Sequence, residues 1–214
     1  MIVIFDLDGT ILDTFSLLEA SVKHSFSKHL CDKTLTHDDI KSFFGPPLTQ
    51  SFYKWCKSEE KTQQMIDTYR MFSNKHMQEY VRVFPHIKRL LTMLKDNHYS
   101  LVILSNKIRQ AVVEQLSYTD LLDFFDMIIG GDDVDKAKPD PEGIMRIKEQ
   151  FKDDAIMIGD SIYDIQAAKN AQVQSIAVCW GVVSKETFEN EKPDKIIEDP
   201  KQLLNAIKEL ETYV

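Results

Sequence analysis

Short apolar segments recur along the chain, and polar residues or glycine bound each of them. Such runs are typical of strands in a parallel sheet that is covered on both faces, because neither face then needs polar positions. We therefore predict five strands, at residues 2–5, 101–104, 127–129, 155–158 and 175–178. The pair Ile196-Ile197 is a candidate for a short sixth strand.

The segments between these strands carry apolar residues at helical spacing. The clearest helical faces consist of Ile87, Leu90, Leu91 and Leu94, of Val112, Val113 and Leu116, and of Ile144, Ile147 and Phe151. Asp140-Pro141-Glu142 predicts the start of the third of these helices, with Asp140 as the N-cap and Pro141 at the first helical position. The alternation of strand and helix predicts an α/β fold with a doubly wound, Rossmann-like parallel sheet.

Residues 14–82 interrupt this alternation, because they contain helical patterns and no convincing strand. A first apolar stripe is formed by Phe15, Leu18, Val22 and Phe26. Thr36 is placed to cap a second helix that stops at Gly45, before the rigid turn of Pro46-Pro47, and Ser58 is placed to cap a third helix. We therefore predict an α/β core of residues 1–13 and 83–214 with an inserted all-helical cap of residues 14–82.

Composition and charge narrow the range of functions. The chain has 214 residues and a formal net charge of −8, which argues against a broad nucleic-acid-binding surface. Its three scattered cysteines argue against a disulfide framework, and the apolar N-terminal run is too short for a signal peptide or a membrane span. We expect a cytoplasmic protein without a nucleic-acid or membrane partner, and the sequence leaves open whether it is a monomer or a dimer.

Polar residues gather after the ends of the predicted strands. The four groups are Asp6-Leu7-Asp8-Gly9-Thr10, Ser105-Asn106-Lys107, Lys138-Pro139, and Gly159-Asp160-Ser161 with Asp164. Each residue alone has a simple structural explanation as a turn acid, a helix cap or a solvated lysine. In open α/β sheets, however, ligands bind beyond the carboxyl ends of the strands, where all four groups converge. The combination indicates a functional site.

The residue types at this edge favour phosphoryl transfer, which needs an in-line nucleophile, charge neutralisation and donors for the phosphoryl oxygens. A carboxylate such as Asp6 can serve as the nucleophile and form an aspartyl phosphate. Clustered carboxylates repel one another unless a hard cation lies among them, and Mg²⁺ accepts carboxylates, waters and a substrate phosphate as ligands. Lys138 adds a fixed positive charge. The sequence thus predicts a Mg²⁺-dependent enzyme acting on a small phosphorylated substrate.

In their order along the chain, these four motifs resemble those of the haloacid dehalogenase superfamily of phosphohydrolases. The resemblance covers the whole chain, and the helical insertion is similar to the cap of the subclass that includes phosphoglycolate phosphatases and β-phosphoglucomutases. It implies that Asp6 is the nucleophile and a metal ligand. It also implies that Asp8 protonates the leaving group, activates water and binds Mg²⁺ through its main-chain carbonyl. Asp160 would bind the metal directly, and Asp164 would support its waters.

The same resemblance implies the residues that contact the substrate. Ser105 and the amide of Asn106 would hold the phosphate, and Lys138 would bridge that phosphate and Asp6. Thr10 would belong to the moving flap beside the substrate. The turn Gly45-Pro46-Pro47-Leu48 resembles the Gly-x-Pro-Leu turn in the caps of phosphoglycolate phosphatases and related pyrophosphatases.

Other functions remain as alternatives. Dehalogenases of this superfamily lack the second acid of the first motif, which is Asp8 here. β-Phosphoglucomutases carry a cap histidine where this chain has Leu17-Leu18-Glu19, and they tend to have glycine in place of Asp164. A phospho-accepting receiver domain would carry its phosphorylated aspartate at the third strand, which ends here in Gly130-Gly131. A non-enzymatic binding protein is a further alternative, although every expected catalytic position is filled.

Overall fold

A computed structural model describes residues 1–211, and within this range six parallel strands form one sheet in the order β5-β4-β1-β6-β7-β8. The strands are β1 (Ile2–Phe5), β4 (Ser100–Leu104), β5 (Met127–Ile129), β6 (Ala155–Gly159), β7 (Gln174–Val178) and β8 (Lys195–Ile197). β1 pairs with β4 on one side and with β6 on the other, so the first strand is central. All five predicted strands and the candidate sixth are present.

Two hydrophobic cores cover β1 because its residues alternate between the two faces of the sheet. Val3 and Phe5 belong to one core, and Ile2 and Ile4 belong to the other. Burial on both faces explains why the sequence of β1 is apolar throughout. The arrangement confirms the predicted α/β fold with a doubly wound parallel sheet.

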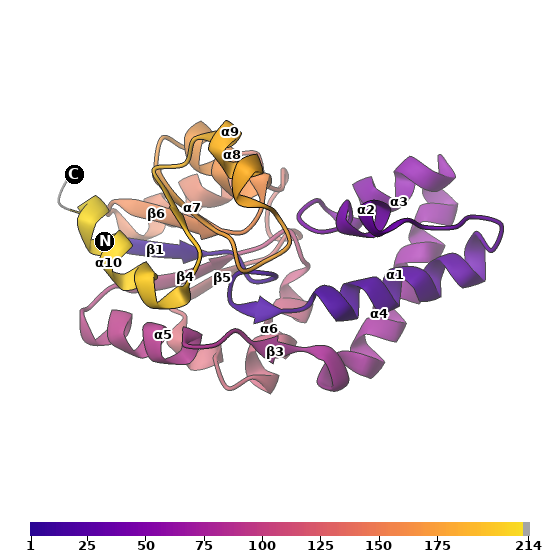
Figure 1. The fold of residues 1–214 in the computed structure, drawn as a ribbon, viewed down its shortest axis with the longest axis horizontal. Helices are drawn as coiled ribbons and strands as arrows, with labels where there is room; N and C mark the ends of the chain where they lie inside the picture. The colour runs from indigo at the N-terminus through magenta and orange to yellow at the C-terminus, as the bar shows by residue number, and fades with distance from the viewer. Residues whose placement is uncertain (212–214) are drawn as a thin grey trace.

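Helices form a layer on each face of the sheet (Figure 1). The helices of this α/β part are α5 (Ile87–Asp96), α6 (Arg109–Tyr118), α7 (Glu142–Phe151), α8 (Ile162–Asn170), α9 (Lys185–Glu191) and α10 (Leu203–Glu211). Apolar residues of α5, α6 and α10 pack with Val3 and Phe5, whereas those of α7 and α8 pack with Ile2 and Ile4. Short 3₁₀ helices occur at Leu122–Phe124 and Pro200–Gln202.

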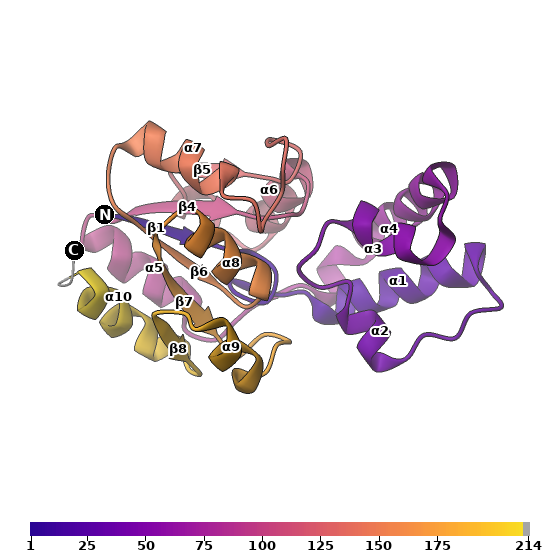
Figure 2. The same cartoon turned by 90° about the horizontal axis from the view of Figure 1, so that it is seen from above.

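Four helices lie between β1 and α5 in sequence and project from one end of the sheet, away from both chain ends (Figure 2). They are α1 (Phe15–His29), α2 (His37–Lys41), α3 (Leu48–Cys56) and α4 (Glu59–Tyr80). A separate aromatic core holds them together, in which Phe43 and Phe52 meet edge to face at a centroid distance of 5.0 Å. Residues 15–80 contain no strand. The division of the chain at residues 13 and 83 stays a prediction.

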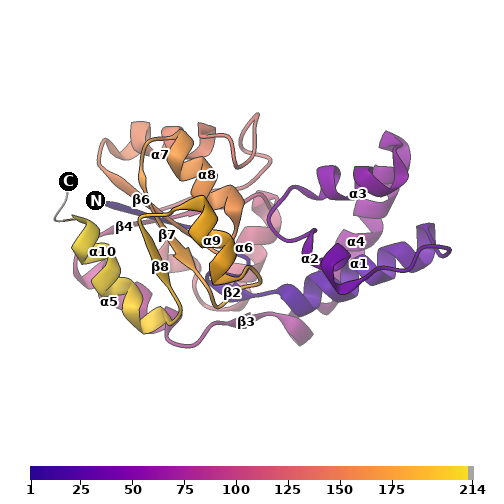
Figure 3. The same cartoon turned by 45° about the horizontal axis from the view of Figure 1, so that its top comes forward.

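A two-stranded antiparallel ribbon joins the helical unit to the sheet (Figure 3). It consists of β2 (Leu12–Asp13) and β3 (Arg82–Val83), with Leu12 opposite Val83. This ribbon was not predicted from the sequence, because two residues are too few to show a periodic pattern. Among residues 1–211, no helix combines the length and the apolar character that crossing a bilayer needs.

Helix starts agree better with the sequence than helix ends do. Thr36 and Ser58 cap α2 and α4 as predicted, each accepting a hydrogen bond from a backbone N–H three residues later. However, α2 ends at Lys41 rather than reaching Gly45, whose φ of +106° lies outside the helical region. Helix α7 begins at Glu142, and Pro141 rather than the predicted Asp140 occupies its N-cap position. Asp140 instead accepts a hydrogen bond from the N–H of Glu142.

Candidate active site

The site begins where β1 leaves the sheet. Asp6 follows the last residue of β1, and its N–H donates to the carbonyl of Ile158 at 2.9 Å, so the backbone holds it in line with the strand. The next turn contains Gly9, with a φ of +78°. A Cβ on Gly9 would lie 2.0 Å from a carboxylate oxygen of Asp160. Glycine is therefore required here for both backbone geometry and space.

Lys138 links three segments beneath the pocket. Its ammonium donates to Asp6 Oδ1 at 2.9 Å, to Asp164 Oδ1 at 2.5 Å and to the carbonyl of Leu104 at 2.8 Å. Burial alone lowers the pKa of this ammonium, but the carboxylates of Asp164 and Asp6 outweigh that effect and hold the pKa above its ordinary value. Lys138 is therefore a fixed positive charge whose three donors are all in use.

The neighbouring carboxylates outnumber this single cation. Oxygens of Asp6, Asp160 and Asp164 lie within 4.8 Å of one another, and all three residues are buried. Burial raises the pKa of Asp6 to about 7, although Lys138 opposes the rise. Burial, together with the charges of Asp6 and Asp164, raises the pKa of Asp160 well above its ordinary value. The cluster is short of positive charge.

This cluster fits a divalent cation. Asp160 Oδ1 accepts from Thr10 Oγ1 at 3.2 Å, whereas Asp160 Oδ2 is buried and has no hydrogen-bond partner within residues 1–211. Both oxygens of Asp164 are already occupied, one by Lys138 and the other by the N–H and hydroxyl of Ser161. A buried, unpaired carboxylate oxygen beside Asp6 is what a hard cation with oxygen ligands requires.

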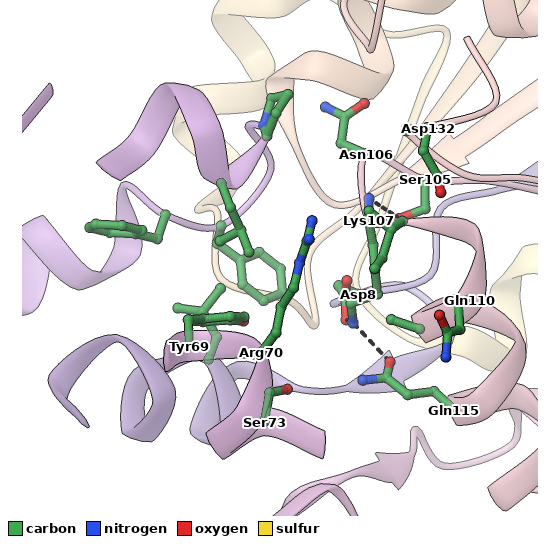
Figure 4. A pocket seen from close by; sticks show the side chains of 18 of the residues that line it. Asp8, Tyr69, Arg70, Ser73, Ser105, Asn106, Lys107, Gln110, Gln115 and Asp132 are labelled. Atoms are coloured by element: carbon green, nitrogen blue, oxygen red, sulfur yellow. Dashed lines mark hydrogen bonds and ion pairs between the residues drawn. The ribbon is translucent and has the colours of Figure 1, made fainter. Parts of the chain in front are cut away.

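Asp8 lies on the pocket side of the cluster (Figure 4) and is held there by two hydrogen-bond donors. Its Oδ1 accepts from Thr14 Oγ1 and from Lys107 Nζ, each at 2.6 Å. Lys107 also donates to Gln115 Oε1 at 2.8 Å, so α6 fixes the position of the ammonium. Asp8 is thus oriented by Lys107, which follows β4, and by Thr14, which precedes α1.

Ser105 and Asn106 lie at the end of β4 and line the same pocket. The Asn106 side chain donates to the carbonyls of Gly45 and Lys138 at 2.8 and 3.0 Å, and its oxygen accepts from Lys138 N–H at 2.9 Å. Asn106 therefore connects the loop before α3 to the loop that carries Lys138.

A cavity of about 410 Å³ separates this edge of the sheet from the helical unit. Asp6, Asp8, Ser105, Asn106 and Lys107 line it on the side of the sheet. On the side of the helices it is lined by Leu18, Phe43, Phe44, Gly45, Pro46, Pro47, Leu48, Thr49, Tyr69, Arg70, Ser73, Asn74 and Met77. The cavity has the size of a small-molecule site, with polar groups concentrated on one wall.

The structure brings most of the predicted site residues together, in two layers. Asp6, Asp8, Ser105 and Asn106 line the pocket, whereas Lys138, Asp160 and Asp164 are buried around Asp6. Thr10 is fully buried and is not among the pocket-lining residues of the described chain, so its position supports a contact with Asp160 rather than with a substrate.

Several residues of the site were not assigned a role from the sequence. Lys107 was visible as the third residue of Ser105-Asn106-Lys107, directly after a strand, but nothing in the sequence paired it with Asp8. Thr14 and Gln115 carry no local signal, because their partners lie on other elements. Arg70 lies within a helix whose pocket-facing side could not be distinguished from sequence.

The fold and this acidic edge define an α/β protein whose chemistry lies beyond the carboxyl ends of parallel strands. Residues 3–178 match the model of the haloacid dehalogenase-like hydrolases. A pyrophosphatase PpaX from Oceanobacillus iheyensis is 35% identical over 208 residues, which cover 96% of this chain and 95% of that protein. The chain therefore belongs to the haloacid dehalogenase-like hydrolases, as the motifs predicted.

Solved structures agree with this assignment. A predicted phosphatase from Clostridium acetobutylicum is 31% identical and superposes with a TM-score of 0.86, covering 97% of each chain. A predicted phosphoglycolate phosphatase from Haemophilus somnus also gives a TM-score of 0.86, with 96% of this chain and 97% of that chain covered. Its identity is 22%, so this second likeness shows the fold alone.

Proposed function

We propose that the protein is a Mg²⁺-dependent phosphohydrolase that transfers the phosphoryl group of a small metabolite to Asp6 and then to water. The observation that carries the proposal is the position of Asp6. It lines the pocket, it is bonded to Lys138 at 2.9 Å, and it lies within 4.8 Å of two further buried carboxylates. This combination supplies a carboxylate nucleophile together with the charges that phosphoryl transfer needs.

In the first step an Asp6 oxygen attacks phosphorus, and the bond from phosphorus to the leaving oxygen breaks. Asp8, in its protonated form, gives its proton to that oxygen, and its position two residues after Asp6 places it on the pocket side. In the second step Asp8 takes a proton from water as the water oxygen attacks the phosphorus of phospho-Asp6. The bond between phosphorus and the Asp6 oxygen then breaks and inorganic phosphate leaves, so that Asp6 is again a carboxylate and Asp8 is again protonated.

Asp6 and Asp160 are the residues that would hold Mg²⁺ directly, together with the main-chain carbonyl of Asp8, as the family resemblance implies. Bound there, the cation would neutralise negative charge on the transferring phosphoryl group. Asp164 would act from outside this set, because Lys138 and Ser161 already occupy its two oxygens. The Ser105 hydroxyl and the main-chain N–H of Asn106 would donate to the phosphoryl oxygens, and Lys138 would keep Asp6 ionised and in place.

The substrate would be a small phosphoric monoester such as phosphoglycolate, or pyrophosphate, the substrate that the names of the relatives indicate. A cavity of about 410 Å³ suits molecules of this size. Leu18 lines the cavity on α1, near the position where the related mutases carry a histidine, and it has no proton to exchange with a sugar hydroxyl. We therefore expect water rather than a second hydroxyl to accept the phosphoryl group.

A panel of phosphorylated metabolites, assayed with Mg²⁺ and in excess chelator, tests the proposal. We expect inorganic phosphate to be released from phosphoglycolate or pyrophosphate with Mg²⁺, and no release in chelator. Hexose 1-phosphate should give free sugar and phosphate if it is accepted. Conversion to hexose 6-phosphate without phosphate release would establish a mutase, and turnover in chelator would refute the metal assignment.

A further inference from the structure

Two cationic side chains line the cavity, and they differ in how they are paired. Lys107 donates to Asp8 Oδ1 and to Gln115 Oε1. The guanidinium of Arg70, on the cap helix α4, makes no hydrogen bond and no ion pair with any residue in the range 1–211. Arginine has five N–H donors in a planar arrangement, so this guanidinium has its full donor capacity available.

The guanidinium of Arg70 points into the cavity. Figure 4 shows its side chain extending from α4 toward the strand ends that carry Asp8, Ser105 and Lys107. Its neighbour Tyr69 is buried, and both Asp8 and Arg70 act on it: burial raises the pKa of the Tyr69 hydroxyl, Asp8 raises it further and Arg70 lowers it. Arg70 therefore lies on the part of the cap that faces the catalytic edge.

The acids that line the cavity are already occupied. Asp6 accepts from Lys138, and Asp8 accepts from Lys107 and Thr14. Glu114 accepts from the Gln110 side chain at 2.9 Å, and Asp132 accepts from the backbone N–H of Arg109 at 2.6 Å. Arg70 is half-buried, so water compensates its charge only in part. A partly desolvated cation without a protein anion is arranged to receive an anion from a ligand.

We propose that Arg70 binds a second anionic group on the substrate, carried by the part of the molecule that leaves when the phosphoryl group is transferred. This inference rests on the proposed function, which places the transferred phosphoryl group at Asp6 and Ser105. Arg70 approaches from the opposite wall, so its anion is a separate group. A carboxylate or a phosphate matches the planar donor arrangement of a guanidinium, and Ser73 and Asn74 beside it add polar groups on the same wall.

Equilibrium binding tests this assignment without turnover. Methylenediphosphonate carries two anionic groups joined by a methylene bridge that the enzyme cannot hydrolyse, whereas methylphosphonate carries one anionic group. With Mg²⁺ present, calorimetry gives the ratio of the Kd of methylphosphonate to the Kd of methylenediphosphonate, for the wild type and for Arg70→Gln. We expect that ratio to fall by about 10- to 100-fold in Arg70→Gln, because a charged, bidentate contact is lost. Arg70→Lys should retain part of the preference, since it keeps the charge and loses the planar geometry.

Lys75→Gln provides a matched control, because it removes one positive charge from an exposed position on the same helix and away from the cavity. It should leave the ratio of Kd values within about twofold of the wild type, since exposed charges contribute little. An equal loss in Lys75→Gln and Arg70→Gln would show a general field effect and overturn the inference. An unchanged ratio in Arg70→Gln would overturn it as well.

Turnover then identifies the kind of anion. Phosphoglycolate and pyrophosphate carry a carboxylate and a phosphate as the second group, and ethyl phosphate carries neither. Arg70→Gln should lower kcat/KM for the first two relative to ethyl phosphate, and the larger loss marks the anion that Arg70 contacts. Equal losses for all three would contradict a role in binding a second anion. If the wild type hydrolyses none of them, the proposed function fails, while the Kd ratio still decides the role of Arg70.

Discussion

The two walls of the cavity differ in how their polar groups are paired. On the sheet side, Lys138 uses all three donors and both oxygens of Asp164 are occupied, so the groups around Asp6 are held in one arrangement. On the cap side, the lining is largely aromatic and aliphatic, and its one cation, Arg70, has no partner among residues 1–211. One wall is organised before a substrate arrives, and the other offers contacts that only a ligand completes.

This difference suggests that the sheet side carries out the reaction and that the cap side selects the substrate. A preorganised set of charges suits a group that every substrate shares, because its geometry need not change between substrates. An apolar wall with a single free charge suits the part of the substrate that varies. The family assignment therefore tells more about the sheet side than about the cap side, since functions vary by changes at the site rather than in the fold.

Loss of the proposed nucleophile should have the largest effect on activity. Asp6→Asn is nearly isosteric and keeps an oxygen for Lys138, so the fold should persist. Phosphate release should nevertheless fall by more than about a hundredfold, because even one lost stabilising donor costs that much at such a site. Release is measured at matched circular dichroism. Asp13→Asn, at an exposed position on β2, serves as the control and should keep full activity. Residual activity above a hundredth of the wild type would place the nucleophile elsewhere.

The acidic cluster gives the next largest effect. Mg²⁺ should raise the Tm of the wild type, because at a concentration a hundred times its Kd it stabilises the folded state by about 2.7 kcal/mol. Asp160→Asn removes the unpaired buried oxygen and should abolish most of that rise. The same substitution should raise the Tm of the metal-free protein, since it relieves repulsion with Asp6. Asp123→Asn, an exposed acid in a short 3₁₀ helix, should change neither value. A full Mg²⁺ response in Asp160→Asn would exclude that carboxylate as a ligand.

The residues on the sheet side were easier to predict from the sequence than those on the cap side. Asp6, Ser105, Lys138 and Asp160 could be placed because each follows an apolar strand or leads into a helix, and parallel strands bring such positions to one edge. The pairing of Lys107 with Asp8 could not be predicted, since the two residues are separated by 99 positions and meet only through side-chain packing.

The cap was less predictable for physical reasons. The apolar stripe on α1 could be predicted and lies in the core of the cap, but α3, which carries Phe52 of the same core, begins directly after Pro47, where the sequence showed only a turn. In α4, Met65 and Tyr69 mark the face that packs in the core of the cap, but no pattern shows which polar residue beside that face reaches a cavity, so Arg70 gave no signal. The β2–β3 ribbon depends on the pairing of Leu12 with Val83 and of Asp13 with Arg82, two pairs of residues that are far apart in sequence.

Lys107 donates to Asp8, the proposed general acid and base, and loss of this hydrogen bond should lower activity by an intermediate amount. Lys107→Met removes one of the two donors to Asp8 Oδ1 and should lower kcat for alkyl phosphates by about tenfold, a fraction of what general acid–base catalysis contributes. The loss should be smaller with p-nitrophenyl phosphate, whose leaving group needs little protonation. Lys54→Met, at an exposed position on α3, is the control. An equal loss with both kinds of ester would show that Lys107 does not act through Asp8.

The smallest effect should come from the loop where the two walls meet. Gly45 has a φ of +106°, its carbonyl accepts a hydrogen bond from Asn106, and a Cβ there would lie 3.1 Å from the Tyr163 ring and 3.3 Å from Ser161 Cβ. Gly45→Ala should therefore displace the loop from the sheet side and cost about 1 kcal/mol or more of folding free energy. The groups around Asp6 keep all their partners, so kcat should change little while KM rises several-fold. Steady-state kinetics on the same ester would check this, with the exposed Ser42→Ala in the same loop as a control. A fall in kcat with an unchanged KM would mean that the loop supports the catalytic groups themselves. The assignment of this loop to substrate binding rather than to the reaction would then be wrong.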